Sequence, residues 1–313
     1  MTIAADRGVT VAPMVEETVS DRGARAARWQ DYAALLKPRV MSLVVFTGLA
    51  GLIAAPGDLH PALAVIAIIA IALGAGAAGA INCWYEADVD AIMRRTKARP
   101  VPMGIISRED AISFALMLSG AMVLTLGLFV NWVAGGLLAF TIFYYGVVYT
   151  MWLKRRTAQN IVIGGASGAF PPVIGWAAVT GDVTLLPIIL FTIIFLWTPP
   201  HFWALSLYAA GDYEKAGIPM LPVTAGAEKT RRHSLIYTLV LFPVALAPWA
   251  LGYAGWVYGL GATLLGLLFI AGAVDLVRQR TDEAARRVFG YSIFYLFGIF
   301  GLLIIEQLGS LLL

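Results

Sequence analysis

Residues 61–90 read PALAVIAIIAIALGAGAAGAINCWYEADVD. The apolar part of this stretch, 61–85, has no charged side chain, and Glu86, Asp88 and Asp90 follow it. A helix needs about 20 apolar residues to cross a bilayer, so the stretch predicts a membrane-spanning helix with an acidic end. Carboxylates at the end of a membrane helix are costly to desolvate and by default mark a functional site.

The rest of the chain repeats this apolar pattern. Of its 313 residues, 60% are hydrophobic and 13% are charged, and the mean hydropathy of +0.81 excludes an ordinary soluble domain. The apolar runs do not alternate with period two, which argues against a β-barrel. We therefore expect an all-α polytopic bundle of nine transmembrane helices. The expected spans are 40–57, 61–82, 111–130, 133–153, 160–180, 184–208, 235–254, 256–276 and 288–311.

The basic residues predict how the bundle is oriented. All 22 Lys and Arg residues fall in the N-terminal tail and in every second connection, and the other connections contain none. Positively charged loops remain in the cytoplasm. We therefore expect the N-terminus and the basic loops on the cytoplasmic side of a bacterial inner membrane, and the C-terminus on the far side.

The N-terminal residues 1–33 are polar and have no apolar core, so they resemble neither a signal peptide nor an acid-poor transit peptide. We interpret them as a disordered cytoplasmic tail, and 34–313 as a single transmembrane domain. The net charge of +3 is explained by topology and by contact with membrane lipid headgroups. It predicts no nucleic-acid partner.

Three oxygen-bearing side chains, Asn82, Glu86 and Asp90, are spaced i, i+4, i+8, which stacks them on one face of a helix. Mg²⁺ prefers such ligands and commonly binds one or two carboxylates together with substrate phosphates, so we expect a metal site here. The alternative is a solvated helix end that only marks the membrane surface. Four cations follow directly, and they suit a diphosphate: Arg94, Arg95, Lys97 and Arg99.

A second long loop, 209–234, repeats the order of acids followed by bases that is found in the loop at 91–110. Its acids and first base are Asp212, Glu214 and Lys215. Long loops in a tight bundle are usually functional. We expect both loops to cover one cytoplasmic mouth, with Asp212 as a further metal ligand.

Two polar residues in apolar surroundings are further candidates. His201 lies among aromatic residues between Trp197 and Trp203, and either it is a buried histidine bonded to a neighbour or it touches a substrate as an iron ligand or proton carrier. Asn160 begins a span at the same level as the acidic motifs, and either it caps the helix or it belongs to the site.

Five motifs follow one another in a recognisable order. They are Asn82-x3-Glu86-x-Asp88-x-Asp90, Met93-Arg94-Arg95-Thr96-x2-Arg99-Pro100, Asn160-x2-Ile163-Gly164-Gly165, Trp197-Thr198-Pro199-Pro200-His201-Phe202-Trp203 and Asp212-Tyr213-x2-Ala216-Gly217-Ile218-Pro219. Their order and spacing resemble the UbiA superfamily of intramembrane prenyltransferases, and within it the branch that farnesylates haem. Two departures stand out: Glu86 where that branch usually has Asp, and Gly211 where a second Asp precedes Asp212.

The resemblance implies transfer of a farnesyl group from farnesyl diphosphate to the 2-vinyl group of haem B, with addition of water. The products would be diphosphate and haem O, a precursor of the haem A of cytochrome oxidase, so the next enzyme of haem A synthesis is an expected partner. The implied Mg²⁺ ligands are Asn82, Glu86, Asp90 and Asp212. The implied catalytic residues are Arg95, Lys97, Arg99 and His201, and the implied substrate-binding residues are Asn160, Trp203 and Lys215.

Two other functions fit parts of the pattern. One is a prenyltransferase of the same superfamily that acts on an aromatic quinone precursor. The other is a cation-coupled transporter, whose acids would lie at mid-bilayer with access from both sides. The acids of this chain lie at one end beside cationic loops, which favours the enzyme.

Overall fold

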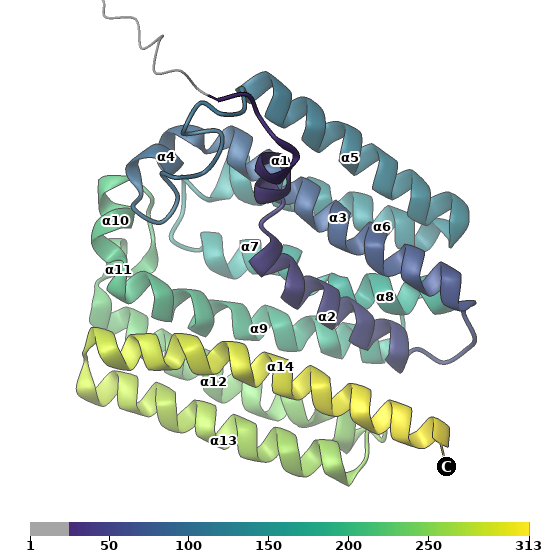
Figure 1. The fold of residues 1–313 in the computed structure, drawn as a ribbon. Helices are drawn as coiled ribbons and strands as arrows, with labels where there is room; N and C mark the ends of the chain where they lie inside the picture. The colour runs from purple at the N-terminus through teal and green to yellow at the C-terminus, as the bar shows by residue number, and fades with distance from the viewer. Residues whose placement is uncertain (1–24, 313) are drawn as a thin grey trace, which may run out of the picture.

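The protein is a bundle of long helices that run side by side, described here for residues 25–312 of a computed structural model (Figure 1). Every regular element in this range is helical. The first half contains α1 (Trp29–Leu35), α2 (Pro38–Ala54), α3 (Pro61–Tyr85), α4 (Ala87–Ile92), α5 (Arg108–Phe129), α6 (Trp132–Phe143), the π-helix η1 (Tyr144–Leu153) and α7 (Asn160–Ala169). The second half contains α8 (Pro171–Thr180), α9 (Leu185–Tyr208), α10 (Ala210–Lys215), α11 (Leu221–Ala225), α12 (Ala227–Ala250), α13 (Trp256–Gln279) and α14 (Asp282–Leu312).

The number of spans agrees with the prediction of nine. Eight helical segments between 25 and 312 are long and apolar enough to cross a membrane, and α1 with α2 forms a ninth that is bent by 59°. Helices α5, α12 and α14 begin earlier than the apolar runs that predicted them. Their first turns carry charged residues, which continue the helix into the membrane surface and which a hydropathy pattern does not count.

The first helix departs from the expected boundary. Helix α1 begins at Trp29, so residues 29–33 are helical, although they were expected to belong to a disordered tail. Arg25 Nη1 pairs with Asp31 Oδ2 at 2.7 Å, and Asp31 also accepts a hydrogen bond from the backbone N–H of Arg28 at 2.9 Å, which fixes the start of the helix. The remainder of the predicted tail, residues 1–24, lies outside the described residues.

Two proline pairs fall within the predicted spans 160–180 and 184–208. Pro171 and Pro172 interrupt the first of these spans, because α7 ends at Ala169 and Pro171 begins α8. Pro199 and Pro200 lie inside α9, which continues through them to Tyr208.

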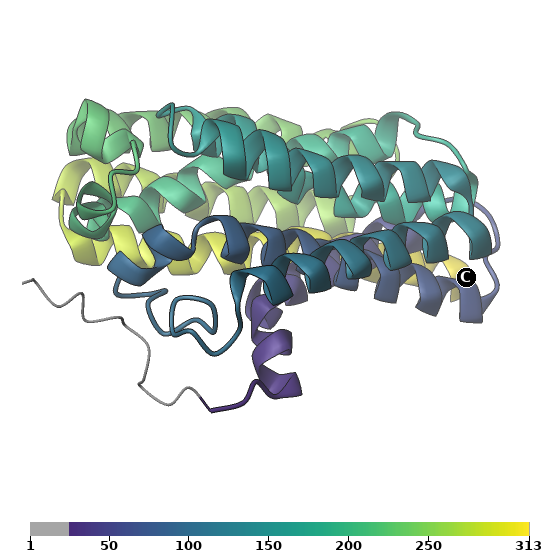
Figure 2. The ribbon, with the colours of Figure 1, turned by 90° about the horizontal axis from the view of Figure 1, so that it is seen from above.

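The short helices α4, α10 and α11 and the two long loops gather at one end of the bundle, which we call the loop end (Figures 1 and 2). An apolar cluster joins the two loops to each other and to α7. It contains Val89, Met93, Ile161, Tyr213, Ile218 and Met220. This one apolar cluster therefore supports the acidic segments of both loops.

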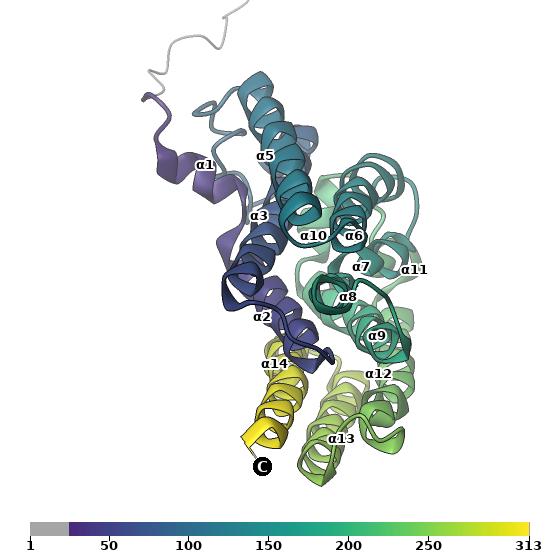
Figure 3. The same ribbon diagram turned by 90° about the vertical axis from the view of Figure 1, so that its right-hand side faces the viewer.

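Helix α2 packs against α8 at unusually short range. A Cβ added at Gly51 would lie 2.0 Å from Pro172 O, and one added at Gly175 would lie 2.1 Å from Gly48 O. Small residues permit this approach between membrane helices. The end-on view shows α14 beside both α2 and α13 (Figure 3). The contact between α2 and α14 places the first half of the bundle next to its last helix.

We expect Gly51→Ala to destabilise the protein by about 1–3 kcal/mol, because the new methyl group meets backbone atoms that cannot rotate away. Gly120→Ala is the matched control: its Cβ would meet nothing within 4 Å, and alanine favours a helix by up to about 1 kcal/mol over glycine. Thermal melting of the two detergent-purified variants tests this. Equal melting temperatures would contradict the close contact between α2 and α8.

Candidate active site

Asn82, Glu86 and Asp90 lie at the loop end and are buried, with 3%, 1% and 2% of their surfaces exposed. Helix α3 ends before Glu86, yet the backbone bonds from Glu86 N to Asn82 O (3.0 Å) and from Asp90 N to Glu86 O (2.8 Å) keep the helical spacing through the junction with α4. Asn82 Nδ2 donates to Glu86 Oε2 at 2.8 Å. The helical spacing that predicted a shared face is thus preserved.

Two lysines that the motif analysis did not single out reach this face. Lys154, which follows η1, forms a buried ion pair with Glu86 Oε2. Lys37, at the bend between α1 and α2, donates from Nζ to Asn82 Oδ1 at 2.6 Å. In the sequence, membrane topology alone explains both lysines, because they lie at the ends of apolar runs. Their position at the same membrane level as Asn82 is the signal that could have identified them.

The first cationic loop contributes a second ion pair to this face. Arg99 Nη1 lies 2.6 Å from Asp90 Oδ2, and the Arg99 side chain is only 23% exposed. Thr96 Oγ1 donates to Asp90 O at 3.1 Å, which anchors the loop to α4. Arg99 is therefore brought to the site as expected, whereas Lys97 is exposed and its side chain forms no hydrogen bond or ion pair within the described chain.

Asp88 points away from this group, as its place in the helix predicts. Its side chain is 55% exposed, and Arg155 donates to both of its carboxylate oxygens, at 2.9 and 2.7 Å. The hydrogen bond from Arg155 holds the pKa of Asp88 below its usual value. Asp88 therefore offers a control for the buried acids.

The second acidic motif lies across from the first. Arg94 Nε lies 3.2 Å from Asp212 Oδ1 on α10. Burial raises the pKa of the neighbouring Tyr213, and the charge of Arg95 partly opposes this rise. Two arginines of the first loop thus reach the second loop. Asp212 itself makes no direct bond to Asn82, Glu86 or Asp90 in the described chain, where no group of three or more His, Cys, Asp or Glu side chains is spaced to hold a metal ion.

The buried oxygens nevertheless suit a divalent cation. Glu86 Oε1 is buried and has no hydrogen-bond partner within the described residues. An ionised oxygen without a partner is costly, so its burial calls for a ligand. With Asn82 and Asp90 on the same face, the donor set contains two carboxylates and an amide. This is the chemistry that Mg²⁺ accepts when phosphates complete its coordination.

Asn160 supports the site indirectly. It is fully buried, and its Nδ2 donates to the carbonyls of Thr157 (2.7 Å) and Lys154 (3.3 Å). These bonds anchor the turn that carries Lys154 toward Glu86. Asn160 Oδ1 is buried without a partner among the described residues, which leaves an acceptor available.

Two other predicted site residues are not brought to this group. Trp203 is buried on the side of α9 that faces α12, where it packs edge-on against Tyr237 with ring centroids 5.3 Å apart. This environment gives Trp203 a packing role. Lys215 is exposed at the end of α10.

His201 occupies the opposite side of α9 and is half-buried. Its ring stacks between those of Trp197 and Phe289, with centroids 4.3 and 4.6 Å away. Its Nδ1 lies 2.7 Å from Ser292 Oγ on α14. The structure thus shows a histidine bonded to a neighbour, and its contact with a substrate stays a prediction.

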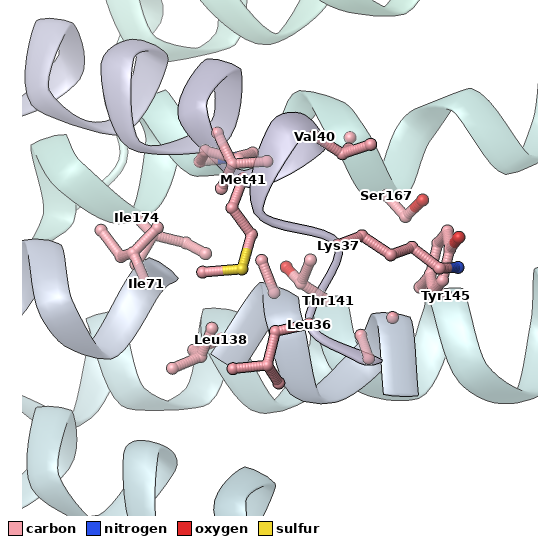
Figure 4. Close-up of a pocket in the computed structure, with 16 residues that line it drawn as sticks. Leu36, Lys37, Val40, Met41, Ile71, Leu138, Thr141, Tyr145, Ser167 and Ile174 are labelled. Carbon is pink, nitrogen blue, oxygen red and sulfur yellow. The ribbon is translucent and has the colours of Figure 1, made fainter. Parts of the chain in front are cut away.

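A cavity lies among α2, α3, α6 and α8, and Lys37 is one of the residues that line it (Figure 4). Its empty space, open mouth included, is about 660 Å³, and most of the residues that line it are apolar. Lys37 and Tyr145 lie toward one end, and Ile71, Leu138 and Ile174 toward the other (Figure 4). Since Lys37 also bonds Asn82, the polar end of the cavity meets the acidic site.

The arrangement of buried acids, cations and apolar cavity can be compared with known proteins. The model of the UbiA prenyltransferase family matches residues 43–299. The chain belongs to this family. Its relatives include the protoheme IX farnesyltransferases of Brucella anthropi, 58% identical over 89% of this chain and 91% of the relative, and of Rhodopseudomonas palustris, 58% identical over 88% and 90%.

Solved structures agree with the fold. A structure of digeranylgeranylglyceryl phosphate synthase matches with a TM-score of 0.75 and 17% identity, covering 90% of this chain and 98% of that one. A UbiA homologue from Archaeoglobus fulgidus bound to GPP and Mg²⁺ matches with a TM-score of 0.64 and 15% identity, covering 87% and 99%. The predicted UbiA-type helical bundle is confirmed, and the protein is a multi-pass membrane prenyltransferase.

Proposed function

We propose that the protein transfers the farnesyl group of farnesyl diphosphate to the 2-vinyl group of haem B, with addition of water, giving haem O and diphosphate. The observation that carries this proposal is the 56–58% identity, over about nine-tenths of both chains, to relatives named protoheme IX farnesyltransferase. The buried acidic site and its adjoining cavity support it, because a diphosphate with an apolar tail needs both environments.

The diphosphate belongs at the loop end. Mg²⁺ bound by Asn82, Glu86, Asp90 and Asp212 would supply Lewis-acid polarisation of the diphosphate oxygens. The chain's own cations then stabilise the leaving group, because fixed positive charge in a site of low polarity lowers the energy of developing negative charge. Arg99 and Lys154 are already held at the acids, and Arg95 and Lys97 lie in the same loop as Arg99.

The farnesyl chain belongs in the cavity of Figure 4, whose far end is lined by Ile71, Leu138 and Ile174. Apolar walls bury the chain and keep bulk water away from the allylic carbon until the vinyl carbon attacks it. A bond then forms between that carbon and the terminal vinyl carbon, while the bond to diphosphate breaks. One water molecule supplies the hydroxyl group of the product and releases a proton.

The orientation in the membrane follows from the basic residues. We infer that the loop end faces the cytoplasm of a bacterial inner membrane. All the basic residues after the N-terminal tail lie in alternate connections between the spans, and positively charged loops remain in the cytoplasm. Water-soluble diphosphate would then leave on the cytoplasmic side. Haem O would remain among the membrane lipids, where the next enzyme of haem A synthesis could bind it.

One assay tests the proposal. Purified protein with haem B, farnesyl diphosphate and Mg²⁺ is expected to give a haem product heavier by one farnesyl and one hydroxyl group. A chelator should abolish the product, and added Mg²⁺ should restore it, because carboxylates and phosphates need a divalent cation between them. Prenylation of an aromatic quinone precursor, with haem unchanged, would overturn the haem assignment and keep the family assignment.

A further inference from the structure

His201 belongs to a small group of side chains between α9 and α14 that the acidic motifs do not include. Trp197 Nε1 donates to the backbone carbonyl of Ser292 at 2.8 Å, and His201 Nδ1 lies 2.7 Å from the hydroxyl oxygen of the same residue. Trp197 and His201 are four residues apart and share a helix face. Both side chains therefore converge on one residue of α14.

The hydrogen bonds around Ser292 define the tautomer of His201. Ser292 Oγ also lies 2.6 Å from the carbonyl oxygen of Phe289. A hydroxyl group has one proton, and a carbonyl oxygen can only accept. Both contacts are satisfied together only if Ser292 donates to Phe289 O and accepts from the Nδ1–H of His201. The lone pair of the neutral imidazole is then on Nε2.

The ring cannot easily turn to use Nε2 elsewhere. Trp197 and Phe289 stack on its two sides at interplanar angles of 18° and 23°, and Phe202 meets its edge at 87°. Nε2 has no hydrogen-bond partner among the described residues, and it is not one of their fully buried partnerless nitrogen and oxygen atoms, so it is partly accessible. A nitrogen lone pair is thus held in a fixed direction and left available.

The surroundings suit a flat macrocycle with acidic substituents. His201 lies seven residues before the end of α9, which is about 10 Å below the loop end. Nearer to that end, the guanidinium of Arg286 lies 5.3 Å from the ring centre of Tyr208, and Tyr208 packs edge-on against Phe289. Aromatic side chains and a cation therefore lie along the same side of α9.

We propose that Ser292 is a positioning residue that keeps His201 in the Nδ1–H tautomer, so that Nε2 ligates the iron of the haem substrate. Metal-binding histidines commonly donate their other ring N–H to an oxygen, which fixes the ring and raises its basicity. The inference rests on the proposed function, because it takes haem as the prenyl acceptor.

The test is a spectroscopic titration of detergent-purified, full-length protein with haem B, without farnesyl diphosphate. His201→Ala is expected to shift the Soret band and to weaken haem binding. Ser292→Ala should raise the dissociation constant about 10-fold, because the hydroxyl oxygen that accepts the hydrogen bond from His201 Nδ1 is lost. Ser292→Thr, which keeps a hydroxyl group, should restore it. Adding imidazole to His201→Gly should recover the wild-type Soret band.

Ser206→Ala is the matched control. Ser206 is buried on α9 and donates to the carbonyl three residues earlier, Trp203 O, at 3.0 Å, as Ser292 does on α14, but it has no histidine partner. Its haem spectrum and affinity should equal those of the wild type. Equal losses in Ser206→Ala and Ser292→Ala would mean that any buried hydroxyl matters, and would overturn the proposed role of Ser292.

Two further outcomes separate this inference from the proposed function. If the wild type binds and farnesylates haem but His201→Ala keeps its Soret band and affinity, the inference is overturned and the proposed function stands. If the wild type neither binds nor farnesylates haem, both are overturned. Farnesyl diphosphate binding, measured on every variant, should stay within about threefold of the wild type, since His201 and Ser292 lie outside the acidic site.

Discussion

Glu86→Gln and Asp90→Asn are each expected to lower farnesyl transfer at least about 100-fold, which corresponds to about 3 kcal/mol of transition-state stabilisation. Each change removes one negative charge from a buried oxygen donor set and keeps the size of the side chain. Without that charge the site cannot hold a divalent cation at the diphosphate. The measurement is the initial rate of haem product formation at saturating Mg²⁺.

Asp88→Asn is the control, because it removes the same charge two residues away, on a different face of the helix. Asp88 is exposed and bonded to Arg155, and a surface ion pair contributes about 0–1 kcal/mol. Its activity should stay near that of the wild type. Glu86→Asp, which restores the residue usual in the haem-farnesylating branch, should also remain active.

Stability must be measured for the same variants, since Glu86→Gln leaves Lys154 without its carboxylate partner. Comparable melting temperatures for the inactive variants and the Asp88→Asn control would show that charge at the site, and not folding, is what was lost. Residual transfer above about a tenth of the wild-type rate in both Glu86→Gln and Asp90→Asn would exclude the metal assignment.

The sequence predicted the spans because the bilayer imposes a length and an apolar composition on each helix. It predicted the acidic face for a similar reason, since buried carboxylates in a membrane protein are rare and costly. It placed the start of the first helix too late. The charges of Arg25 and Asp31 hide that helix from a hydropathy pattern, while their pairing stabilises it in the structure.

The partners of the acids could not be predicted in the same way. Lys154 is 68 residues from Glu86, and His201 is 91 residues from Ser292, so each pair depends on which helices pack together. A lysine at the end of an apolar run has an ordinary explanation in membrane topology. Its membrane level makes Lys154 a candidate, and the packing of η1 against α3 then brings it to Glu86.

The position of Asp212 shows a second limit to what the sequence could predict about the site. Its place after α9 predicted a role beside the first motif, and the structure brings the two loops together. Asp212 is nevertheless bonded to Arg94 and not to the acids of α3 and α4. With Gly211 beside it, the second loop offers one firm carboxylate, and the proposed metal ligation by Asp212 would require its ion pair with Arg94 to open.

Arg99→Ala should lower kcat about 100-fold, with a change in the KM for farnesyl diphosphate within about threefold. Arg99 is largely buried and held by Asp90, so its charge is preorganised and little screened. Such a charge acts more strongly on the diphosphate as it leaves than on the bound substrate, in which the negative charge is smaller. Arg95→Ala should also lower kcat, but by a smaller factor, because Arg95 is exposed.

Steady-state kinetics with farnesyl diphosphate as the varied substrate separate the two parameters. Arg108→Ala is the control, because Arg108 follows the same loop, is 52% exposed and lies 4.0 Å from Asp88. It should leave both parameters unchanged. A rise in KM alone for Arg99→Ala would make Arg99 a docking residue, since an interaction that is equal in the ground state and the transition state does not alter kcat.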